Sequence, residues 1–301
     1  MGVKWFFSGR VVMNVNKISV ITLTYKNSHL LSKAIDSVSN QNAQFVQDVE
    51  YIILDDGSDN FNLDYVRNKL KDCKFDTRII INESNIGTVK AFNRAINESS
   101  GDIIVPLSAD DEFYDEYVLD NISREFEKTN ALIITGLRVP VIDSQEQAEL
   151  PLKKHRKLFL NSSSLLKHII YRSNIISGAS TYYHKDIFKK VGYFDERYKL
   201  LEDLPFFLKA LFKGHSIRLL DKRTIKYGTD GISSSKIVNP ILKKDFTQCY
   251  SDLYRYPIGF FGKRFVKYQR VMDFKNKTEI GNIVLYPEQY LFFTLKKILN
   301  R

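Results

Sequence analysis

The chain has 301 residues, of which 44% are hydrophobic and 27% charged, so it can bury a sizeable core and has the composition of an ordinary globular protein. No apolar run approaches the roughly 18 uninterrupted residues that span a bilayer, which argues against an integral membrane protein. The net charge is +10, but residues 236–301 alone carry 13 Lys and Arg against 5 Asp and Glu. The rest of the chain is nearly neutral, which is unlike a nucleic-acid-binding domain.

The two cysteines, Cys73 and Cys249, are far apart and have no CxxC partner. They predict neither a zinc site nor a disulfide framework, and they fit a reducing cytoplasm. Residues 1–17 contain an aromatic cluster that Arg10 and Asn14 follow, with no small-residue cleavage site after it. We interpret this stretch as an N-terminal extension and not as a secretory signal.

The first hundred residues repeat one pattern three times: an apolar strand, a polar turn and a helix with apolar residues at helical spacing. The three strands are expected at 18–23, 50–54 and 77–81. A fourth, at 102–106, is rich in β-branched residues and typical of a buried strand. This order predicts an α/β fold, with a mostly parallel sheet and helices on its faces.

Polar and acidic residues follow each of these predicted strands. Because right-handed crossovers place such turns along one edge of the sheet, we expect them to meet in one crevice, where ligands of open α/β sheets bind. They are Thr24, Tyr25, Asp55, Asp56, Asn85 and Asp110. The acidic run that starts at Asp110 can hold a metal ion, and the alternative is that it caps the following helix.

The second half of the chain is expected to continue with helices and strands, without repeats or low-complexity linkers. Helices are predicted at 117–128, 158–171 and 204–212. Strands are predicted at 131–135, within SGASTYYHKDIF, at 217–220 and at 224–227, and residues 145–157 are expected to form a surface excursion. This gives one domain over 18–235 and a basic, aromatic C-terminal region over 236–301.

Six segments, in order, carry a resemblance to the family 2 glycosyltransferases. They are ITLTYKNSHLLSKAIDSVSNQ, EYIILDDGSDN, NIGTVKAFNRAI, GDIIVPLSADDEF, GASTYYHKDIFKKVGYFDE and LLEDLPFFLKAL. The similarity runs from about Ile18 to Ser235 and implies the GT-A fold. It also implies transfer of a sugar from a nucleotide-diphosphate donor, usually uridine-linked, to a hydroxyl acceptor, with inversion and with a divalent cation (Mn²⁺ or Mg²⁺).

The resemblance assigns the turn residues to the donor. Positions that match the family's donor-binding positions are Thr24, Tyr25, Asp55, Asp56, Asn85, Gly87, Lys90, Ser108, Ala109 and Asp110. The first four match residues that line the base and ribose. Lys90, or Arg94 one turn further on, is the candidate counter-charge for the diphosphate. The alternatives are that Tyr25 only packs on the next helix and that Lys90 and Arg94 are solvated helix residues.

Two positions depart from the family pattern. The family usually has Asp, any residue, Asp where this chain has Ser108, Ala109 and Asp110. Asp110 matches the metal-binding position, whereas the Ser108 hydroxyl brings no charge, which affects metal affinity more than nucleotide binding. Later, relatives carry Tyr, Arg, any residue, His where this chain has YGTD, so that Asp230 is an alternative oxygen ligand for the metal.

Two acidic residues stand at the start of the helix predicted at 204–212. The resemblance implies that Asp203 is the catalytic base, which takes the proton of the acceptor hydroxyl, and that Glu202 orients the acceptor or a backbone group. The alternative is an acidic first turn that complements the helix dipole.

In the C-terminal region, aromatic residues alternate with Lys and Arg, and a basic amphipathic helix is expected at 288–300. Such a region can lie on an anionic membrane surface, which suits a lipid-linked saccharide acceptor, or it can pack on the core or on a second subunit of a homodimer. The sequence therefore predicts a cytoplasmic enzyme, or one at the inner face of the cell membrane, that builds surface polysaccharide (capsule) or glycolipid. The alternatives are a nucleotidyltransferase and a degenerate nucleotide-sugar-binding module.

Overall fold

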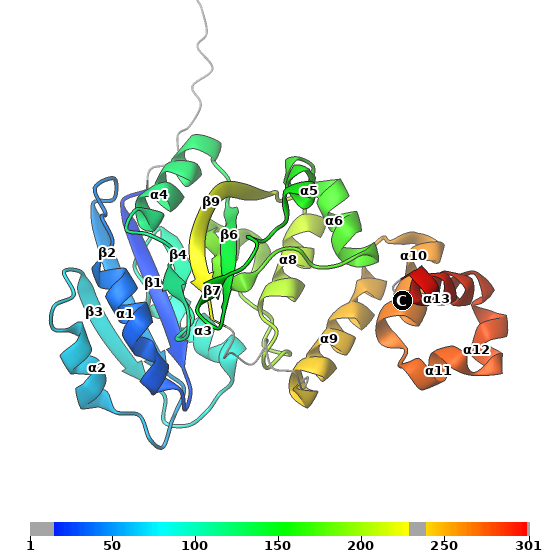
Figure 1. Cartoon of the computed structure of the whole chain (residues 1–301), viewed down its shortest axis with the longest axis horizontal. Coiled ribbons are helices and arrows are strands. Elements are labelled where there is room, and N and C mark those ends of the chain that lie inside the picture. Colours follow the sequence, from blue (N-terminus) through cyan, green and yellow to red (C-terminus); the bar gives the residue numbers. More distant parts are fainter. Residues whose placement is uncertain (1–14, 229–238, 300–301) are drawn as a thin grey trace, which may run out of the picture.

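The computed structural model describes residues 15–228 and 239–299. Within them, a nine-stranded sheet lies between helices, and a group of short helices extends from one end of the molecule (Figure 1). The strands are β1 (Lys17–Thr24), β2 (Asp48–Asp55), β3 (Asp76–Ile81), β4 (Ile103–Pro106), β5 (Glu112–Phe113), β6 (Ile133–Ile142), β7 (Gln145–Glu146), β8 (Thr181–His184) and β9 (Ile217–Tyr227).

The sheet order is β3-β2-β1-β4-β8-β6-β9-β5, with β7 paired to β6. The first four strands are parallel, with β1 in the middle, and β6 and β9 form a second, long parallel pair. Strand β8 joins the two halves because it runs antiparallel to both β4 and β6. The carboxyl ends of β1, β2 and β4 therefore lie at one edge, as the sequence predicts.

Helices cover both faces of the sheet and bury two hydrophobic clusters. One cluster packs residues of α1, α2 and α4 against the sheet, and the other packs residues of α3, α6, α7 and α8. These helices, with the short α5, are α1 (Leu31–Ser39), α2 (Leu63–Leu70), α3 (Thr88–Glu98), α4 (Val118–Thr129), α5 (Lys153–Arg156), α6 (Ser162–Tyr171), α7 (Asp186–Val191) and α8 (Asp203–Phe212).

The C-terminal region is helical throughout its described part. Its helices are α9 (Pro240–Asp252), α10 (Gly259–Phe265), α11 (Phe274–Thr278), α12 (Ile280–Leu285) and α13 (Pro287–Leu299), with a π-helical segment, Val266–Val271, after α10. Helix α9 packs against the main domain, and α10 to α13 lie beyond it (Figure 1). No helix within 15–228 or 239–299 is long and apolar enough to cross a bilayer.

The α/β class, the flanking helices and the C-terminal helical extension are confirmed. Two details of the predicted elements are wrong. Strand β9 is one strand over 217–227 and not two, and its polar residues 221–222 lie at an irregularity, where the register with β6 jumps from the pair Thr135–Leu219 to the pair Leu137–Arg223. Strand β6 extends to Ile142, beyond the strand predicted at 131–135. His184 is buried at the end of β8, where its Nδ1 accepts a hydrogen bond from the backbone N–H of Asp186.

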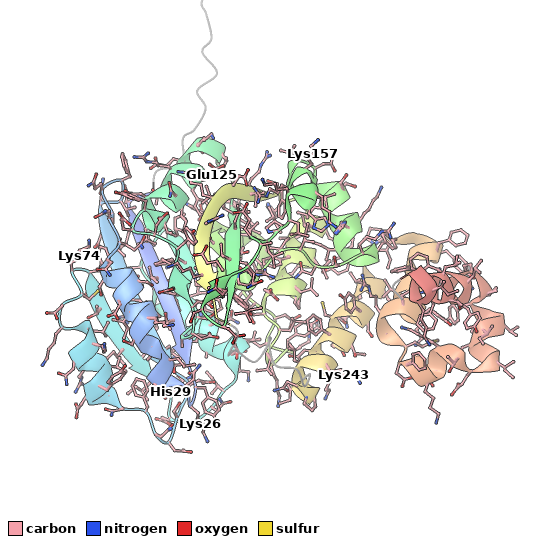
Figure 2. All side chains as sticks on the ribbon, viewed as in Figure 1. Lys26, His29, Lys74, Glu125, Lys157 and Lys243 are labelled. Atoms are coloured by element: carbon pink, nitrogen blue, oxygen red, sulfur yellow. The ribbon has the colours of Figure 1, made fainter. Side chains whose placement is uncertain are left out.

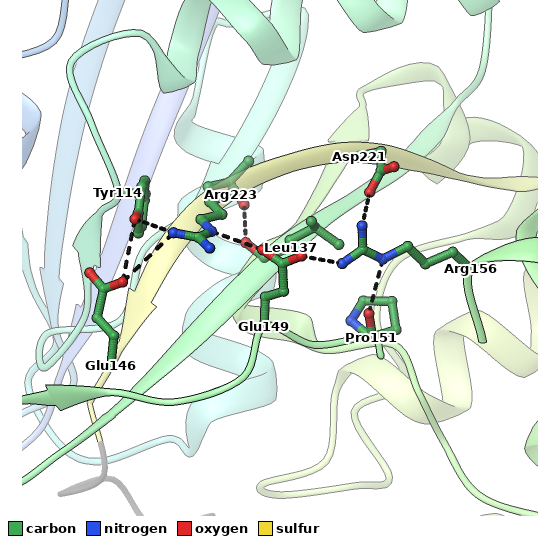
Figure 3. A network of polar contacts seen from close by, with 9 residues as sticks. Tyr114, Leu137, Glu146, Glu149, Pro151, Arg156, Asp221 and Arg223 are labelled. Carbon is green, nitrogen blue, oxygen red and sulfur yellow. Dashed lines mark hydrogen bonds and ion pairs between the residues drawn. The ribbon is translucent and has the colours of Figure 1, made fainter. Parts of the chain in front are cut away.

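The polar excursion between β6 and α6 is fastened to β9 by a charged network (Figure 3). Glu149 accepts hydrogen bonds from Arg156 and from Arg223, and Arg156 also donates to Asp221. Arg223 in turn donates to the hydroxyl of Tyr114, at 2.6 Å. The excursion is therefore an ordered cover of the sheet edge and not a loose loop.

Candidate active site

The first two turns at the carboxyl edge are joined to each other. Thr24 and Asp55 are partners in the β1–β2 register, and the carboxylate of Asp55 accepts hydrogen bonds from the backbone N–H and the hydroxyl of Ser58, at 2.7 and 2.6 Å. The Ser58 hydroxyl accepts a hydrogen bond from the N–H of Lys26 in the first turn. Figure 2 shows Lys26 and His29 at this edge of the molecule.

Asp56 holds the second turn to the third. Its carboxylate accepts hydrogen bonds from the side-chain amide of Asn82 and from the backbone N–H groups of Ile86 and Gly87, at 2.6 to 3.0 Å. Gly57 has φ +74°, and a side-chain carbon there would lie 2.4 Å from the backbone of Ser84, so only glycine fits this crossing. Asp55 and Asp56 are thus buried, and their carboxylates stabilise the turns. A ligand would have to use the lone pairs that these hydrogen bonds leave over.

The predicted residues that face solvent are in the first and third turns. Tyr25 has 43% of its surface exposed, and its ring lies 5.3 Å from the Lys26 ammonium. Asn85 and Lys90 are exposed, and Gly87, with φ +89°, begins α3. An open aromatic ring beside two polar turns is a surface on which a planar base can stack.

The acidic turn after β4 contacts the end of β9. The N–H of Gly228 donates to Oδ1 of Asp111 at 2.8 Å, and a side-chain carbon at Gly228 would lie 2.4 Å from the carbonyl oxygen of Asp110. Asp111 is buried, and burial together with the neighbouring Asp110 raises its pKa to about 8. Asp110 and Ser108 are half-buried at the mouth of this turn, and Ala109 is buried.

The donor groups around Asp110 suit a cation that is shared with a phosphate. Within the described ranges, no three His, Cys, Asp or Glu side chains form a cluster that could enclose a metal ion. Mg²⁺ and related cations are commonly held by one or two carboxylates together with substrate phosphates and water, and Asp110 fits that smaller role. Asp230, the second predicted ligand, lies outside the described residues.

The predicted catalytic pair lies at the start of α8, against the turn that leads into β8. Asp203 accepts a hydrogen bond from the backbone N–H of Gly178 at 3.1 Å, and a side-chain carbon at Gly178 would come within 3.3 Å of both carboxylates. Burial and the charge of Asp203 raise the pKa of Glu202 to about 8. Burial also raises the pKa of Asp203, although the Leu204 and Gly178 N–H groups and Arg138 oppose the shift.

Arg138 of β6 connects the two acidic groups, and the sequence analysis missed it. Burial lowers the pKa of its guanidinium, while the charges of Tyr227, Asp203 and Asp111 act in the opposite direction. Its Nε is buried and has no hydrogen-bond partner among residues 15–228 and 239–299. The turn after β4 and the start of α8 therefore share one electrostatic environment. The only sequence signal for this residue is a charge inside an apolar strand.

The loop before Glu202 is held by the C-terminal region. Asp245 of α9 is 5% exposed, and its Oδ2 accepts hydrogen bonds from the backbone N–H groups of Lys199 and Leu200, at 2.9 and 2.8 Å. The carbonyl of Lys199 accepts a hydrogen bond from the N–H of Val89, next to the third turn. A carboxylate 42 residues after Asp203 therefore fixes the approach to the catalytic pair.

The Asp245→Ala variant is expected to lose about 1–3 kcal/mol of unfolding free energy, because two partly buried N–H groups lose a charged acceptor. Because the loop leads directly to Glu202, we also expect a fall in kcat of about tenfold with little change in donor binding. Urea unfolding and initial rates measure the two effects. Asp273→Ala, which removes the N-cap of α11, is the control, and an equal loss of kcat in that variant would contradict the positioning role.

A cavity of about 640 Å³ lies elsewhere, between α4, the segment after α1 and β9. Its lining includes Phe45, Tyr117, Arg124 and Lys222, and none of the predicted site residues. This cavity is therefore separate from the acidic turns.

Strands β1 to β4 are parallel and carry acidic turns at their carboxyl edge, and Glu202 and Asp203 lie at the start of α8. This arrangement is that of the GT-A type of α/β fold. Residues 19–192 match the family profile described as "Glycosyl transferase family 2". The protein belongs to glycosyltransferase family 2.

Characterised structures and sequence relatives agree with this assignment. The chain is 26% identical to the uncharacterised glycosyltransferase YwdF of Bacillus subtilis over 194 residues, which cover 64% of this chain and 68% of YwdF. It is 25% identical to EpsJ, another uncharacterised glycosyltransferase of that organism, over 73% of this chain and 63% of EpsJ.

Solved structures of TarS from S. aureus share the fold at 18% sequence identity. The complex of TarS 1–349 with UDP-GlcNAc superposes with a TM-score of 0.64, over 91% of this chain and 79% of that one. A second TarS structure superposes with a TM-score of 0.59 over 87% of this chain, and the superposed part is 43% of that TarS chain.

Proposed function

We propose that the enzyme transfers a sugar from a UDP-sugar to a hydroxyl of a saccharide or lipid-linked saccharide, with inversion at the anomeric carbon. The observation that carries the proposal is the position of β6 between the two acidic groups. On one side β6 pairs with β9, and Gly228, which follows β9, donates a hydrogen bond to Asp111 beside Asp110. On the other side β6 pairs with β8, which follows the Gly178 turn that Asp203 holds. We assign the first group to the phosphate end of a donor and the second to an acceptor hydroxyl. TarS, which shares the fold, has been crystallised with UDP and with UDP-GlcNAc.

In this proposal the first three turns bind the nucleotide. The exposed ring of Tyr25 stacks on the base, and Asp55 and Asp56 keep Thr24 and the third turn in register while accepting hydrogen bonds from base and ribose. Asn85, Gly87 and Lys90 extend this surface at the start of α3. Ser108 and Ala109 line the path to Asp110.

The chemistry needs one base on the acceptor side. Asp203 takes the proton of the acceptor hydroxyl as its oxygen bonds to the anomeric carbon, and the bond from that carbon to the diphosphate oxygen breaks on the opposite face. Glu202 orients the acceptor. Asp110 would hold a divalent cation, Mn²⁺ or Mg²⁺, which would supply positive charge to the departing diphosphate.

A nucleotide-release assay tests the proposal. The purified protein is incubated with UDP-sugars that differ in the sugar, with and without Mn²⁺, and UDP release is measured. Release of UDP that depends on Mn²⁺ supports the proposal. Pyrophosphate release would favour a nucleotidyltransferase, and binding of UDP-sugars in a thermal-shift assay without any turnover would favour a binding module.

We further propose that this reaction belongs to surface polysaccharide or glycolipid assembly on the cytoplasmic side of the cell membrane. Family membership and the basic C-terminal region support this assignment. An acceptor with a lipid anchor would require the enzyme to work at the membrane surface.

The catalytic pair also predicts a pH dependence. Because burial raises the pKa of both carboxyls, the base is protonated at low pH, and kcat/KM should rise with pH to a midpoint well above the value of about 4 of an ordinary carboxyl. Besides each other, the pair faces Arg138 of β6, Tyr183 of β8 and Cys249 of α9.

Rates measured across the range where the enzyme stays folded give this midpoint. Arg138→Gln removes a cation that lowers the pKa of Asp203, so the midpoint should move further upward in that variant. A wild-type midpoint at the ordinary carboxyl value, or a downward movement in Arg138→Gln, would show that this pair is not the titrating base.

A further inference from the structure

Exposed apolar side chains gather in the helices beyond α9. Of the nineteen large apolar residues that are exposed in the described part of the chain, ten lie between Phe260 and Ile298. Phe261 is 74% exposed and Ile280 is 80% exposed. Soluble monomers rarely expose apolar side chains in such concentration unless the surface binds something.

The apolar residues of α13 are divided between two sides of the helix. Gln289 is buried, and Phe293 lies against the rings of Tyr268 and Phe274, so this side faces the other helices. The residues Leu291, Leu295 and Ile298 are half or more exposed and recur at spacings of four and three, so they form one outward stripe. Tyr268 is fully buried among these helices. The three residues of the stripe, in contrast, are left largely uncovered by the described part of the chain.

The stripe of α13 continues onto α10 and α12. Arg264 of α10 forms an ion pair with Glu288, one turn before Leu291, and donates a hydrogen bond to the carbonyl of Leu285 at the end of α12. Phe260 and Phe261 precede Arg264 by one turn and are both exposed. We call the surface formed by these six residues the apolar face: Phe260, Phe261, Leu285, Leu291, Leu295 and Ile298.

Cationic side chains accompany the apolar face. Lys263 and Lys267 are exposed on the same helical stretch as Phe260. Residues 259–299 contain 8 Lys and Arg against 3 Asp and Glu. A surface that is both apolar and cationic complements the acyl and headgroup layers of an anionic membrane.

Charge also argues against a second copy of this chain as the occupant. A two-fold dimer would bring the same surface against itself, so its lysines would face each other, and the cores of protein interfaces are depleted of lysine. An anionic leaflet offers the opposite charge and has no such conflict.

We propose that the apolar face inserts into the headgroup layer of an anionic membrane, with Lys263 and Lys267 at the lipid phosphates. The inference adds to the proposed function the surface by which the enzyme reaches a lipid-anchored acceptor, and it depends on that function only for the nature of the acceptor. Helix α9 precedes the helices of this face in the chain, and its Asp245 accepts hydrogen bonds from the loop before Glu202.

Co-sedimentation of the full chain with vesicles tests the proposal. The wild type should bind vesicles of phosphatidylcholine with one third phosphatidylglycerol, should bind pure phosphatidylcholine much more weakly, and should lose affinity at high salt. Phe260→Ser with Phe261→Ser should weaken binding at least about tenfold, since two large apolar side chains leave the lipid. Lys263→Glu with Lys267→Glu should weaken it at least about twentyfold, since each cation near an anionic surface contributes about fivefold.

Leu160→Ser is the matched control, because Leu160 is 76% exposed but lies outside the C-terminal helices. UDP binding, measured by thermal shift, should be unchanged in all variants. Absence of UDP binding in the wild type would contradict the proposed function, whereas the vesicle assay tests only the membrane surface. Equal binding to both vesicle types, or equal loss in the Leu160 control, would overturn the proposal. A wild-type dimer in solution that Phe260→Ser with Phe261→Ser makes monomeric would instead assign the apolar face to self-association.

Discussion

The Asp203→Asn variant is expected to turn over donor and acceptor about a thousandfold more slowly than the wild type, because the amide cannot take the acceptor proton. The Gly178 N–H donates to Oδ2 of Asp203 and the Leu204 N–H donates to Oδ1, so the single oxygen of asparagine keeps one of these two hydrogen bonds. Because asparagine has the same size as aspartate, the start of α8 should stay in place. The measurement is kcat with a saturating UDP-sugar. Thermal shift with UDP should give the wild-type value.

The matched control is Asp186→Asn, since Asp186 is likewise the first residue of a helix, α7, and has no proposed role in the reaction. Its kcat should change by less than about threefold, the ordinary effect of an exposed surface charge. If Asp203→Asn retained a tenth of the wild-type rate or more, the base would have to be another group. Glu202, with its pKa raised to about 8, would be the first to examine.

The Asp110→Asn variant is expected to lower kcat/KM at least about a hundredfold, because charge neutralisation by a bound cation contributes several kcal/mol to such a transition state. The Mn²⁺ concentration that gives half-maximal rate should rise in the variant. Binding of UDP in the absence of metal should remain, since the turns that carry Asp55 and Asp56 are held by contacts that Asp110 does not make.

Glu116→Gln is the control for this variant, because Glu116 is exposed and lies six residues further along the chain. It should leave both the rate and the Mn²⁺ dependence unchanged. Wild-type metal dependence in Asp110→Asn would mean that Asp110 is not a ligand, and the chain would then have to use a different means of stabilising the leaving diphosphate.

The sequence predicts the half of the fold in which local signals are strong. The strands that precede Thr24, Asp55 and Asp110 are continuous β-branched runs, and the turns after them carry glycine and acidic residues, so both the elements and their common edge could be inferred. Strand β9 was predicted as two pieces because Asp221, Lys222 and Arg223 interrupt its apolar pattern. Asp221 and Arg223 contact charged partners, and the register with β6 shifts at this point and resumes at Arg223.

The residues that the sequence does not reveal act through partners far away in the chain. Arg138 lies among apolar neighbours in a strand, and its partners Asp111 and Asp203 are 27 and 65 residues away. Asp245 belongs to helix α9, whose polar and apolar residues are only weakly separated on opposite sides. Its two hydrogen bonds come from backbone N–H groups, which a pattern of side chains does not reveal. The roles given to Asp203, Glu202 and Asp110 by resemblance stay predictions until the variants are measured.

The contact that Asp245 makes has a consequence for how this enzyme can be divided. Shortening the chain at about residue 235, where the family resemblance fades, would remove the acceptor for two partly buried amides directly ahead of the acidic pair. We expect such a fragment to fold around its sheet and to be a poor catalyst. The smallest fragment that is fully active is therefore expected to extend at least through α9.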